Sequence, residues 1–331
     1  RGTFCWGKGD AGQVGDGLST DRNAPTRVLT TVDLVSLDAG AFHTCGVAAD
    51  GRAFCWGKGS EGQLGNGGTQ DWSTPALVSS TIRFESVSAG TSHTCGVATT
   101  GDTYCWGSGQ RGRLGTGNTG SRFSPGLVLG GLVFTAVSAG DSHTCGVTAP
   151  GVVYCWGAGD DGRLGTGNTL DRLEPTPTNG NLAFTQVSAG GEHTCGIADD
   201  GNVFCWGNGA DGQLGSGTTT DRLQPFLVTG GLDFGRVSAS LDHTCGAASD
   251  GSAYCWGAGT SGQLGTGNVL RRLDPSLVSG PVGHATVTAG ADHTCSFLID
   301  GTAYCWGLGE AGRLGTGNED TRLTPTRVIG G

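Results

Sequence analysis

The dipeptide Cys-Trp recurs along this chain of 331 residues, and each copy lies 50 residues after the one before it. The copies stand at 5–6, 55–56, 105–106, 155–156, 205–206, 255–256 and 305–306. The tripeptide His-Thr-Cys and a single proline recur with the same period. A period near 50 residues, with short apolar runs and turn residues inside it, is typical of the blades of a β-propeller.

Four short segments in each period are predicted to be strands. In one repeat they are residues 134–140, 143–147 and 152–157, and the outer strand of the preceding repeat is 125–130. A tight turn that ends in glycine joins the second strand to the third, which suits a left-handed residue in a hairpin. The outer strand is expected to begin with proline and to form the edge of its blade, because proline cannot donate to a ladder.

The repeats predict a single all-β domain over residues 1–331, a seven-bladed β-propeller with four-stranded antiparallel blades, one of them incomplete. The complete repeats are 32–81, 82–131, 132–181, 182–231, 232–281 and 282–331. Residues 1–31 hold only the third and fourth strands, a half blade. Either further residues of a longer chain or strands from a neighbouring subunit or protein partner would complete it.

Each complete repeat contains two cysteines ten residues apart, and the predicted hairpin register places them opposite each other, within disulfide range. The six predicted disulfides are Cys45–Cys55, Cys95–Cys105, Cys145–Cys155, Cys195–Cys205, Cys245–Cys255 and Cys295–Cys305, and Cys5 is unpaired. Zinc is the alternative, since His43 lies two residues before Cys45. A structural zinc site needs four ligands, and no fourth ligand recurs in every repeat.

The charge balance excludes several classes of partner. The formal net charge is −10, with two lysines and scattered arginines. A nucleic-acid partner is not expected, because phosphates require a basic surface.

No segment approaches the roughly 20 apolar residues of a membrane span. Six disulfides need an oxidising compartment, so we expect secretion or the cell surface.

Gly157, Gly159 and Gly162 have the G-x-G-x-x-G spacing of a dinucleotide-binding loop. The same spacing recurs in every period, and no helix is predicted to follow it, so the helix N-terminus that receives phosphate is missing. We therefore expect no cofactor. The glycines are predicted to let the chain turn tightly between the third strand and the outer strand.

The segment Gly-x-x-His-Thr-Cys-Gly-Val, followed by Asp-Gly-x-x-Tyr-Cys-Trp-Gly-x-Gly-x-x-Gly-x-Leu-Gly-x-Gly, resembles the repeat of the regulator of chromosome condensation family over essentially the whole chain. The resemblance implies a seven-bladed propeller, and the cysteine pairs are similar to a bacterial exported branch. The nuclear founder's guanine nucleotide exchange is not expected, because this chain is acidic and has no wedge-like insertion. A secreted bacterial β-lactamase inhibitor shares the propeller but not the cysteines, which makes enzyme inhibition one alternative function.

Sequence variation is concentrated at the two residues before each repeated histidine and at the residues between the glycines of each loop. A meander places both sets on one face, and a constant framework with one varied face suits a binding surface. Drift at solvated loops is the other interpretation. The candidate partner-binding residues are Phe42, Trp72, Asp141, Glu192, Leu241 and Asp292.

The sequence therefore predicts extracellular protein–protein recognition or an assembly scaffold, without enzyme activity. The repeated histidines are expected to pack the blades by hydrogen bonding to a neighbouring loop. Asp141, Ser142 and His143 have the residue types of a catalytic triad, but adjacent residues cannot converge on one reacting atom. A carbohydrate-binding module is the alternative, and Trp72, which lies outside the Cys-Trp series, is its one supporting residue.

Overall fold

The computed structural model describes residues 2–330, which form β-strands, turns and short 3₁₀ segments. The chain divides into two compact units. Unit 1 consists of Arg1–Arg22, Thr26–Gly159 and Leu170–Pro177, and unit 2 consists of Asn23–Pro25, Asp160–Thr169 and Thr178–Gly331. No helix within residues 2–330 has the length and apolar character that crossing a bilayer requires.

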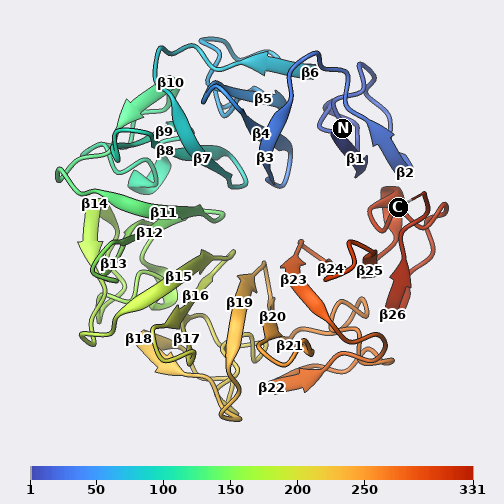
Figure 1. The fold of residues 1–331 in the computed structure, drawn as a ribbon. Helices are drawn as coiled ribbons and strands as arrows, with labels where there is room; N and C mark the ends of the chain where they lie inside the picture. The colour runs from blue at the N-terminus through green and yellow to red at the C-terminus, as the bar shows by residue number, and fades with distance from the viewer. Residues whose placement is uncertain (1, 331) are drawn as a thin grey trace. The chain divides into compact units, whose positions relative to one another are not determined.

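Unit 1 contains three sheets, each an antiparallel meander of four strands in chain order (Figure 1). The strands are β3 (Leu34–Ala39), β4 (His43–Ala48), β5 (Ala53–Gly57) and β6 (Trp72–Leu77); β7 (Phe84–Ala89), β8 (His93–Ala98), β9 (Thr103–Gly107) and β10 (Arg122–Leu127); and β11 (Phe134–Ala139), β12 (His143–Thr148), β13 (Val153–Gly157) and β14 (Arg172–Pro177). The 3₁₀ segment η1 (Gln110–Gly112) follows β9.

Unit 2 repeats this architecture in three further sheets. The strands are β15 (Phe184–Ala189), β16 (His193–Ala198), β17 (Val203–Gly207) and β18 (Arg222–Leu227); β19 (Phe234–Ala239), β20 (His243–Ala248), β21 (Ala253–Gly257) and β22 (Arg272–Leu277); and β23 (His284–Ala289), β24 (His293–Leu298), β25 (Ala303–Gly307) and β26 (Arg322–Arg327). Unit 2 also contains η2 (Asp160–Gly162) and η3 (Glu310–Gly312).

The prediction of seven blades is wrong. Within residues 2–330 the structure has six four-stranded antiparallel blades, and the remaining strands, β1 (Phe4–Gly7) and β2 (Arg22–Arg27), form a separate two-stranded sheet. The sequence count treated residues 1–31 as part of a blade because they carry the same motifs. In the structure β1 pairs with β2 alone, so these motifs make one strand pair and not a blade.

The position of the outer strand also differs from the prediction. It begins at Arg122, three residues before Pro125, so the proline lies inside the strand rather than at its start. The pairing register between β10 and β9 shifts between Arg122 and Gly126, so Pro125 is not part of the regular ladder. This irregularity explains why a residue without an N–H group is tolerated there. β10 is nevertheless an edge strand, as predicted.

The structure contains the six predicted disulfides, one in each four-stranded blade. In each blade the two cysteines are direct cross-strand partners, as Cys145 and Cys155 are. Their Cα atoms lie 4.1 Å apart in all six pairs. Cys5 is a free thiol, and burial raises its pKa to about 12, which keeps it protonated near neutral pH.

The apolar core lies between successive blades. In unit 1, Val47 and the Cys45–Cys55 disulfide pack in one cluster with Phe84 and Trp106 of the next blade. The rings of Phe84 and Trp106 have centroids 5.7 Å apart. Within each unit, a blade therefore buries one face against the blade that follows it, so consecutive repeats are needed to complete the core.

Polar groups also connect successive blades. The Nε2 atom of His43 lies 2.7 Å from the Thr94 hydroxyl in the following repeat. The same pair recurs within each unit as His93–Thr144, His193–Thr244 and His243–Thr294, at 2.8–3.0 Å. The histidines were predicted to bond a neighbouring loop. The partner is instead a threonine on the second strand of the next blade, because the ring points from one blade face to the next.

We call the side of β24 that carries His293, Cys295 and Phe297 the β24 face. Within residues 2–330, no following blade packs against it as one does against the equivalent face of the other blades of unit 2. Phe297 is 49% exposed, whereas the equivalent residues of the preceding blades are at most 3% exposed. Those residues are Val47, Val97, Val147, Ile197 and Ala247. His293 and Cys295 are partly exposed as well. No threonine hydroxyl within residues 2–330 bonds Nε2 of His293.

Candidate functional site

The glycine-rich loop that follows the third strand of each blade is a structural corner. In the second repeat Gly57 has φ +105°, and a β-carbon there would lie 2.7 Å from the Phe42 carbonyl oxygen. At Gly59 a β-carbon would lie 2.0 Å from the carbonyl oxygen of Gln70. The 3₁₀ segments in these loops are three residues long and offer no helix terminus for phosphate. The G-x-G-x-x-G spacing therefore serves close backbone approach.

An aspartate from the start of the outer strand caps this corner. The Asp71 carboxylate accepts a hydrogen bond from the Gly59 N–H group at 2.8 Å. Asp21, Asp171 and Asp221 make the same contact in their own repeats at 2.8–3.0 Å. All four carboxylates therefore cap the corner of their own repeat.

The two variable sets of loop residues lie side by side, as the meander predicted. The Lys58 N–H group donates to the Phe42 carbonyl oxygen at 2.9 Å, which joins the glycine-rich loop to the connection before the repeated histidine. The same backbone contact recurs at Ser108–Ser92, Ala158–Ser142, Asn208–Glu192, Ala258–Asp242 and Leu308–Asp292. We call the surface formed by these two connections the loop surface.

In unit 1 the loop surface contains a pocket of about 220 Å³. Phe42, Lys58, Glu61 and Gln63 line it from one repeat. Thr91, Ser92, Ser108 and Gln110 line it from the next. The Phe42 ring lies under two ammonium groups, 5.2 Å from Lys58 Nζ and 5.8 Å from Lys8 Nζ. Such cation–π contacts hold the only two lysines of the chain at one aromatic side chain.

Asp141 lies beside this pocket and is held in place by two contacts. Its carboxylate accepts a hydrogen bond from the Thr91 hydroxyl. Its carbonyl oxygen accepts one from the Arg113 guanidinium at 2.9 Å, and the same guanidinium also donates to the Ser92 hydroxyl at 2.7 Å. Burial lowers the pKa of Arg113, and the charges of Asp141 and Glu61 oppose that shift.

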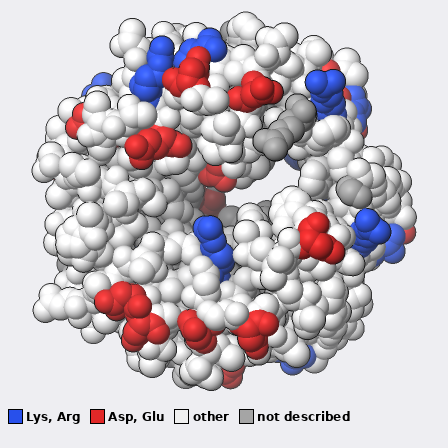
Figure 2. All heavy atoms as spheres, in the orientation of Figure 1, with Lys and Arg blue, Asp and Glu red and all other residues white. Residues whose placement is uncertain are grey.

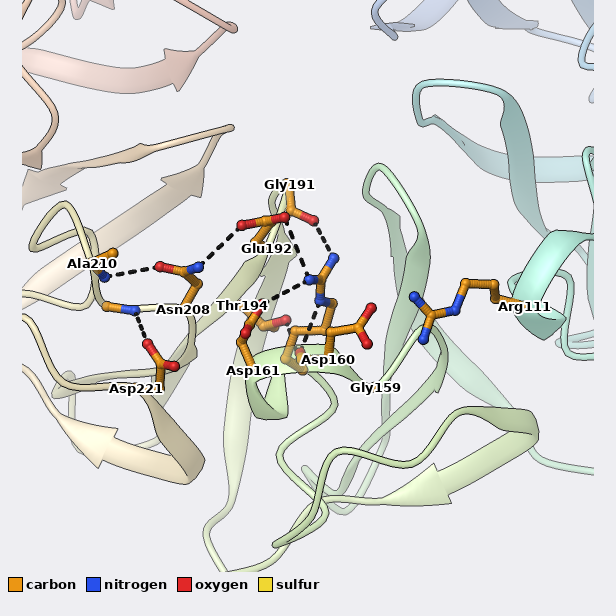
Figure 3. Close-up of polar contacts among 12 residues, drawn as sticks. Arg111, Gly159, Asp160, Asp161, Gly191, Glu192, Thr194, Asn208, Ala210 and Asp221 are labelled. Atoms are coloured by element: carbon orange, nitrogen blue, oxygen red, sulfur yellow. Dashed lines mark hydrogen bonds and ion pairs between the residues drawn. The ribbon is translucent and has the colours of Figure 1, made fainter.

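In unit 2 a polar network orders the loop surface around Glu192 (Figure 3). The Arg163 guanidinium donates to the Gly191 carbonyl oxygen at 3.1 Å and lies 3.7 Å from the Glu192 carboxylate. Glu192 also accepts a hydrogen bond from the Asn208 amide at 3.1 Å. Glu192 is therefore partly engaged within the protein, and its side chain is 52% exposed.

Of the remaining candidate residues, Trp72 belongs to unit 1, and Leu241 and Asp292 belong to unit 2. Leu241 and Asp292 are partly exposed in unit 2. Trp72 is 45% exposed at the start of β6, where it pairs with Gly57, and it does not line the pocket. That the six candidates bind a partner stays a prediction.

The buried histidines do not resemble catalytic bases. Burial lowers the pKa of His43 to about 4, and that of His193 and His243 to about 3. All three rings are buried, and each bonds a threonine of the next blade. They remain neutral at physiological pH and have no contact with solvent, so they support packing rather than proton transfer.

Charged side chains occur in small groups on the face that Figure 2 presents, and no continuous basic surface is visible there. Some charged side chains of the protein are paired, such as Lys8 with Asp10 at 3.1 Å and Arg111 with Asp171. Lys58 makes no ion pair within residues 2–330.

Sequence reasoning missed Lys58 and Gln63 as site residues. The sequence could have pointed to these two residues, because a lysine and a glutamine recur at the equivalent positions of the preceding repeat, as Lys8 and Gln13.

Comparison with known proteins agrees with this architecture. The model of the RCC1-like domain family matches residues 2–329. Human WBSCR16 is 22% identical with a TM-score of 0.90, and the match covers 98% of this chain and 94% of that one. Prp20 of Saccharomyces cerevisiae is 21% identical with a TM-score of 0.87, over 98% and 85% of the two chains. At such identities these likenesses establish the fold alone. A search of curated protein sequences gives no match.

Proposed function

Since the chain belongs to the RCC1-like domain family, we propose that it is a protein-recognition module that binds its partner through the loop surface and catalyses no reaction. The observation that carries the proposal is the contrast between framework and loops. Disulfides and histidine–threonine pairs recur from blade to blade, whereas the residue pair before each repeated histidine and the residue pair inside each glycine-rich loop change from one repeat to the next. Repeat scaffolds present binding surfaces in this manner.

Yeast Prp20, which shares the fold, has been crystallised bound to Kap60, and its binding properties towards Gsp1p and histones have been described. That neighbour supports protein binding as a use of this fold. Guanine nucleotide exchange is not part of our proposal, because it would be carried over from fold likeness alone.

We place the protein outside the cell, secreted or at the cell surface, in a bacterial exported branch of the family. The six disulfides are consistent with an oxidising compartment. In the reducing cytosol such pairs would be kept as thiols, and each blade would lose its cross-strand link. An assembly scaffold, an enzyme inhibitor and a carbohydrate-binding module are the alternative roles for the same surface.

Phe42 and Trp72 are the aromatic side chains that we expect to anchor a protein partner. Alanine at either position should weaken partner binding about tenfold, about 1.4 kcal/mol, without changing the melting temperature. Binding is measured by biolayer interferometry against the partner isolated from the native source. Val152→Ala, in the turn between β12 and β13, is the matched control. Full affinity in both aromatic variants would remove these residues as anchors, and selective glycan binding would favour the carbohydrate alternative.

A strand-donating partner or neighbouring subunit is a further part of the proposal. The third strand of each blade pairs on both edges, whereas β1 pairs only with β2 within residues 2–330. An open edge of this kind accepts an added strand. Cys5 holds on β1 the position that Cys55 holds on β5. Non-reducing mass spectrometry of the native assembly should find Cys5 joined to a partner peptide, and a free Cys5 thiol would contradict strand donation at this edge.

A further inference from the structure

Two consecutive repeats place a lysine and a glutamine at the same positions but differ in the acid between them. In the first repeat they are Lys8 and Gln13, with Asp10 between them; in the second they are Lys58 and Gln63, with Ser60 in place of the aspartate. The two repeats can therefore be compared as an occupied site and its empty counterpart.

In the first repeat the Asp10 carboxylate is bound through both oxygens. Lys8 Nζ lies 3.1 Å from one oxygen, and the Gln13 amide donates to the other at 3.1 Å. The hydrogen bond from Gln13 is the main cause of the lowered pKa of Asp10, and Lys8 adds to it. An ammonium group and an amide N–H₂ group thus form a complete carboxylate clamp.

In the second repeat the clamp is present and the carboxylate is missing. The Gln63 side-chain oxygen accepts the Glu61 N–H at 2.9 Å, as Gln13 accepts the Ala11 N–H at 2.9 Å, so both amides are held in the same manner. Gln63 is 1% exposed and lines the 220 Å³ pocket together with Lys58. Within residues 2–330 its Nε2 atom makes no hydrogen bond, and Lys58 forms no ion pair.

Other repeats show that this combination is specific to the second one. In the fifth, the Gln213 amide donates to the Asn208 side chain at 3.1 Å and is satisfied internally. In the sixth, Gln263 is present but Ala258 replaces the lysine, so no cation is available. Only the second repeat combines an unpaired lysine with an amide donor that has no acceptor inside the described protein.

Resting on the proposed function, we infer that this pocket binds the carboxylate of an aspartate or glutamate side chain from the protein partner, at the position that Asp10 occupies in the first repeat. Phe42 packs against the aliphatic stem of that side chain and fixes both lysines above its ring. Glu61 also lines the pocket, and its carboxylate interacts electrostatically with the Arg113 guanidinium. The pocket volume suits one side chain and is too small for an extended glycan.

The experiment titrates the protein with N-acetyl-glutamate N-methylamide and, as the matched neutral probe, N-acetyl-glutamine N-methylamide. The side-chain amide resonances of Gln63 are followed by NMR. We expect millimolar binding of the glutamate probe and at least tenfold weaker binding of the glutamine probe. Equal binding of the two probes would overturn the inference.

Two variants make the test specific to the clamp. Ser60→Asp supplies the missing carboxylate from within the chain, and Lys58→Ala reproduces the sixth repeat; each should weaken the glutamate probe at least tenfold. The first repeat already folds with an aspartate at this position, so Ser60→Asp should melt like the wild type. Asp10→Ser should open a second site and raise the stoichiometry to two. Unchanged binding of the glutamate probe to Ser60→Asp would overturn the inference. The proposed function is tested separately, by the affinity of the Phe42→Ala and Trp72→Ala variants for the protein partner.

Discussion

The second strands of the last two blades, β20 and β24, have nearly the same backbone pairing but very different surroundings. In both, a histidine opens the strand and a cysteine two residues later is linked to the third strand. The β20 face is covered by β23, and its His243 and Ala247 are at most 3% exposed. On the β24 face the equivalent of Ala247 is Phe297, which is 49% exposed.

The difference shows that a blade does not bury its own inner surface. The hydrogen bonds, the disulfide and the turn are complete in both hairpins, so local structure is satisfied without cover. Burial of the histidine, the disulfide and the apolar residue depends on the next blade, through contacts such as His243–Thr294. In energetic terms the interface between neighbours, rather than the single repeat, supplies most of the hydrophobic stabilisation.

The largest expected contrast is between Ile197→Ala and Phe297→Ala, which truncate the same position in a covered and an uncovered blade. Ile197 is 3% exposed in an apolar cluster, so its removal leaves a cavity and should cost about 3 kcal/mol of unfolding free energy. Phe297 is half in water, and its truncation should cost less than about 1 kcal/mol. Urea unfolding under non-reducing conditions measures both.

Val152→Ala, at a turn position that is 36% exposed, controls for the loss of methyl groups at the surface. Equal destabilisation by Ile197→Ala and Phe297→Ala would break the comparison, because it would mean that the β24 face is covered as fully as the others. If the two substitutions destabilised the native assembly equally but the isolated chain unequally, a strand-donating partner would be supported instead.

Much of the fold follows from the sequence because the 50-residue period is uninterrupted. The position of Cys145 and Cys155 across a hairpin follows from the turn length, and their pairing was predicted correctly. The blade count was not, because it depends on which strands meet in space, and motif counting cannot decide whether β1 and β2 stand alone. The start of the outer strand was misplaced for a different reason: a proline breaks the ladder without ending the strand.

The candidate site was only partly predictable. That Phe42 and Lys58 share one surface follows from the order of strands in a meander, and the structure joins them through a backbone hydrogen bond. The clamp could not be recognised from either residue alone. It depends on the hydrogen-bond partner that Gln63 lacks and Gln13 has, which is a property of side-chain placement. Trp72 was singled out by its type, yet it lies outside the pocket.

A smaller and pH-dependent contrast is expected between His243 and His293. Burial lowers the pKa of His243 to about 3 and that of His293 to about 4, both below the ordinary value of 6.5. In the unfolded chain each ring binds a proton near pH 6.5, whereas in the folded protein it does so only at the lower pKa. Each histidine therefore contributes stability that is fully present above pH 6.5 and is lost as the pH falls towards the folded pKa.

Glutamine at either position removes one titrating group and should reduce the acid-induced loss of stability by roughly 1.4 kcal/mol per pH unit below pH 6.5. The reduction should continue to about pH 3 in His243→Gln and level off near pH 4 in His293→Gln, because these are the folded-state pKa values of the two rings. Unfolding free energies from urea titrations between pH 7 and pH 3.5 provide the measurement, with the exposed Asp33→Asn as a control. An unchanged pH profile in His243→Gln would show that the covered ring already binds its proton in the folded protein, and the next blade would then not be what keeps it neutral.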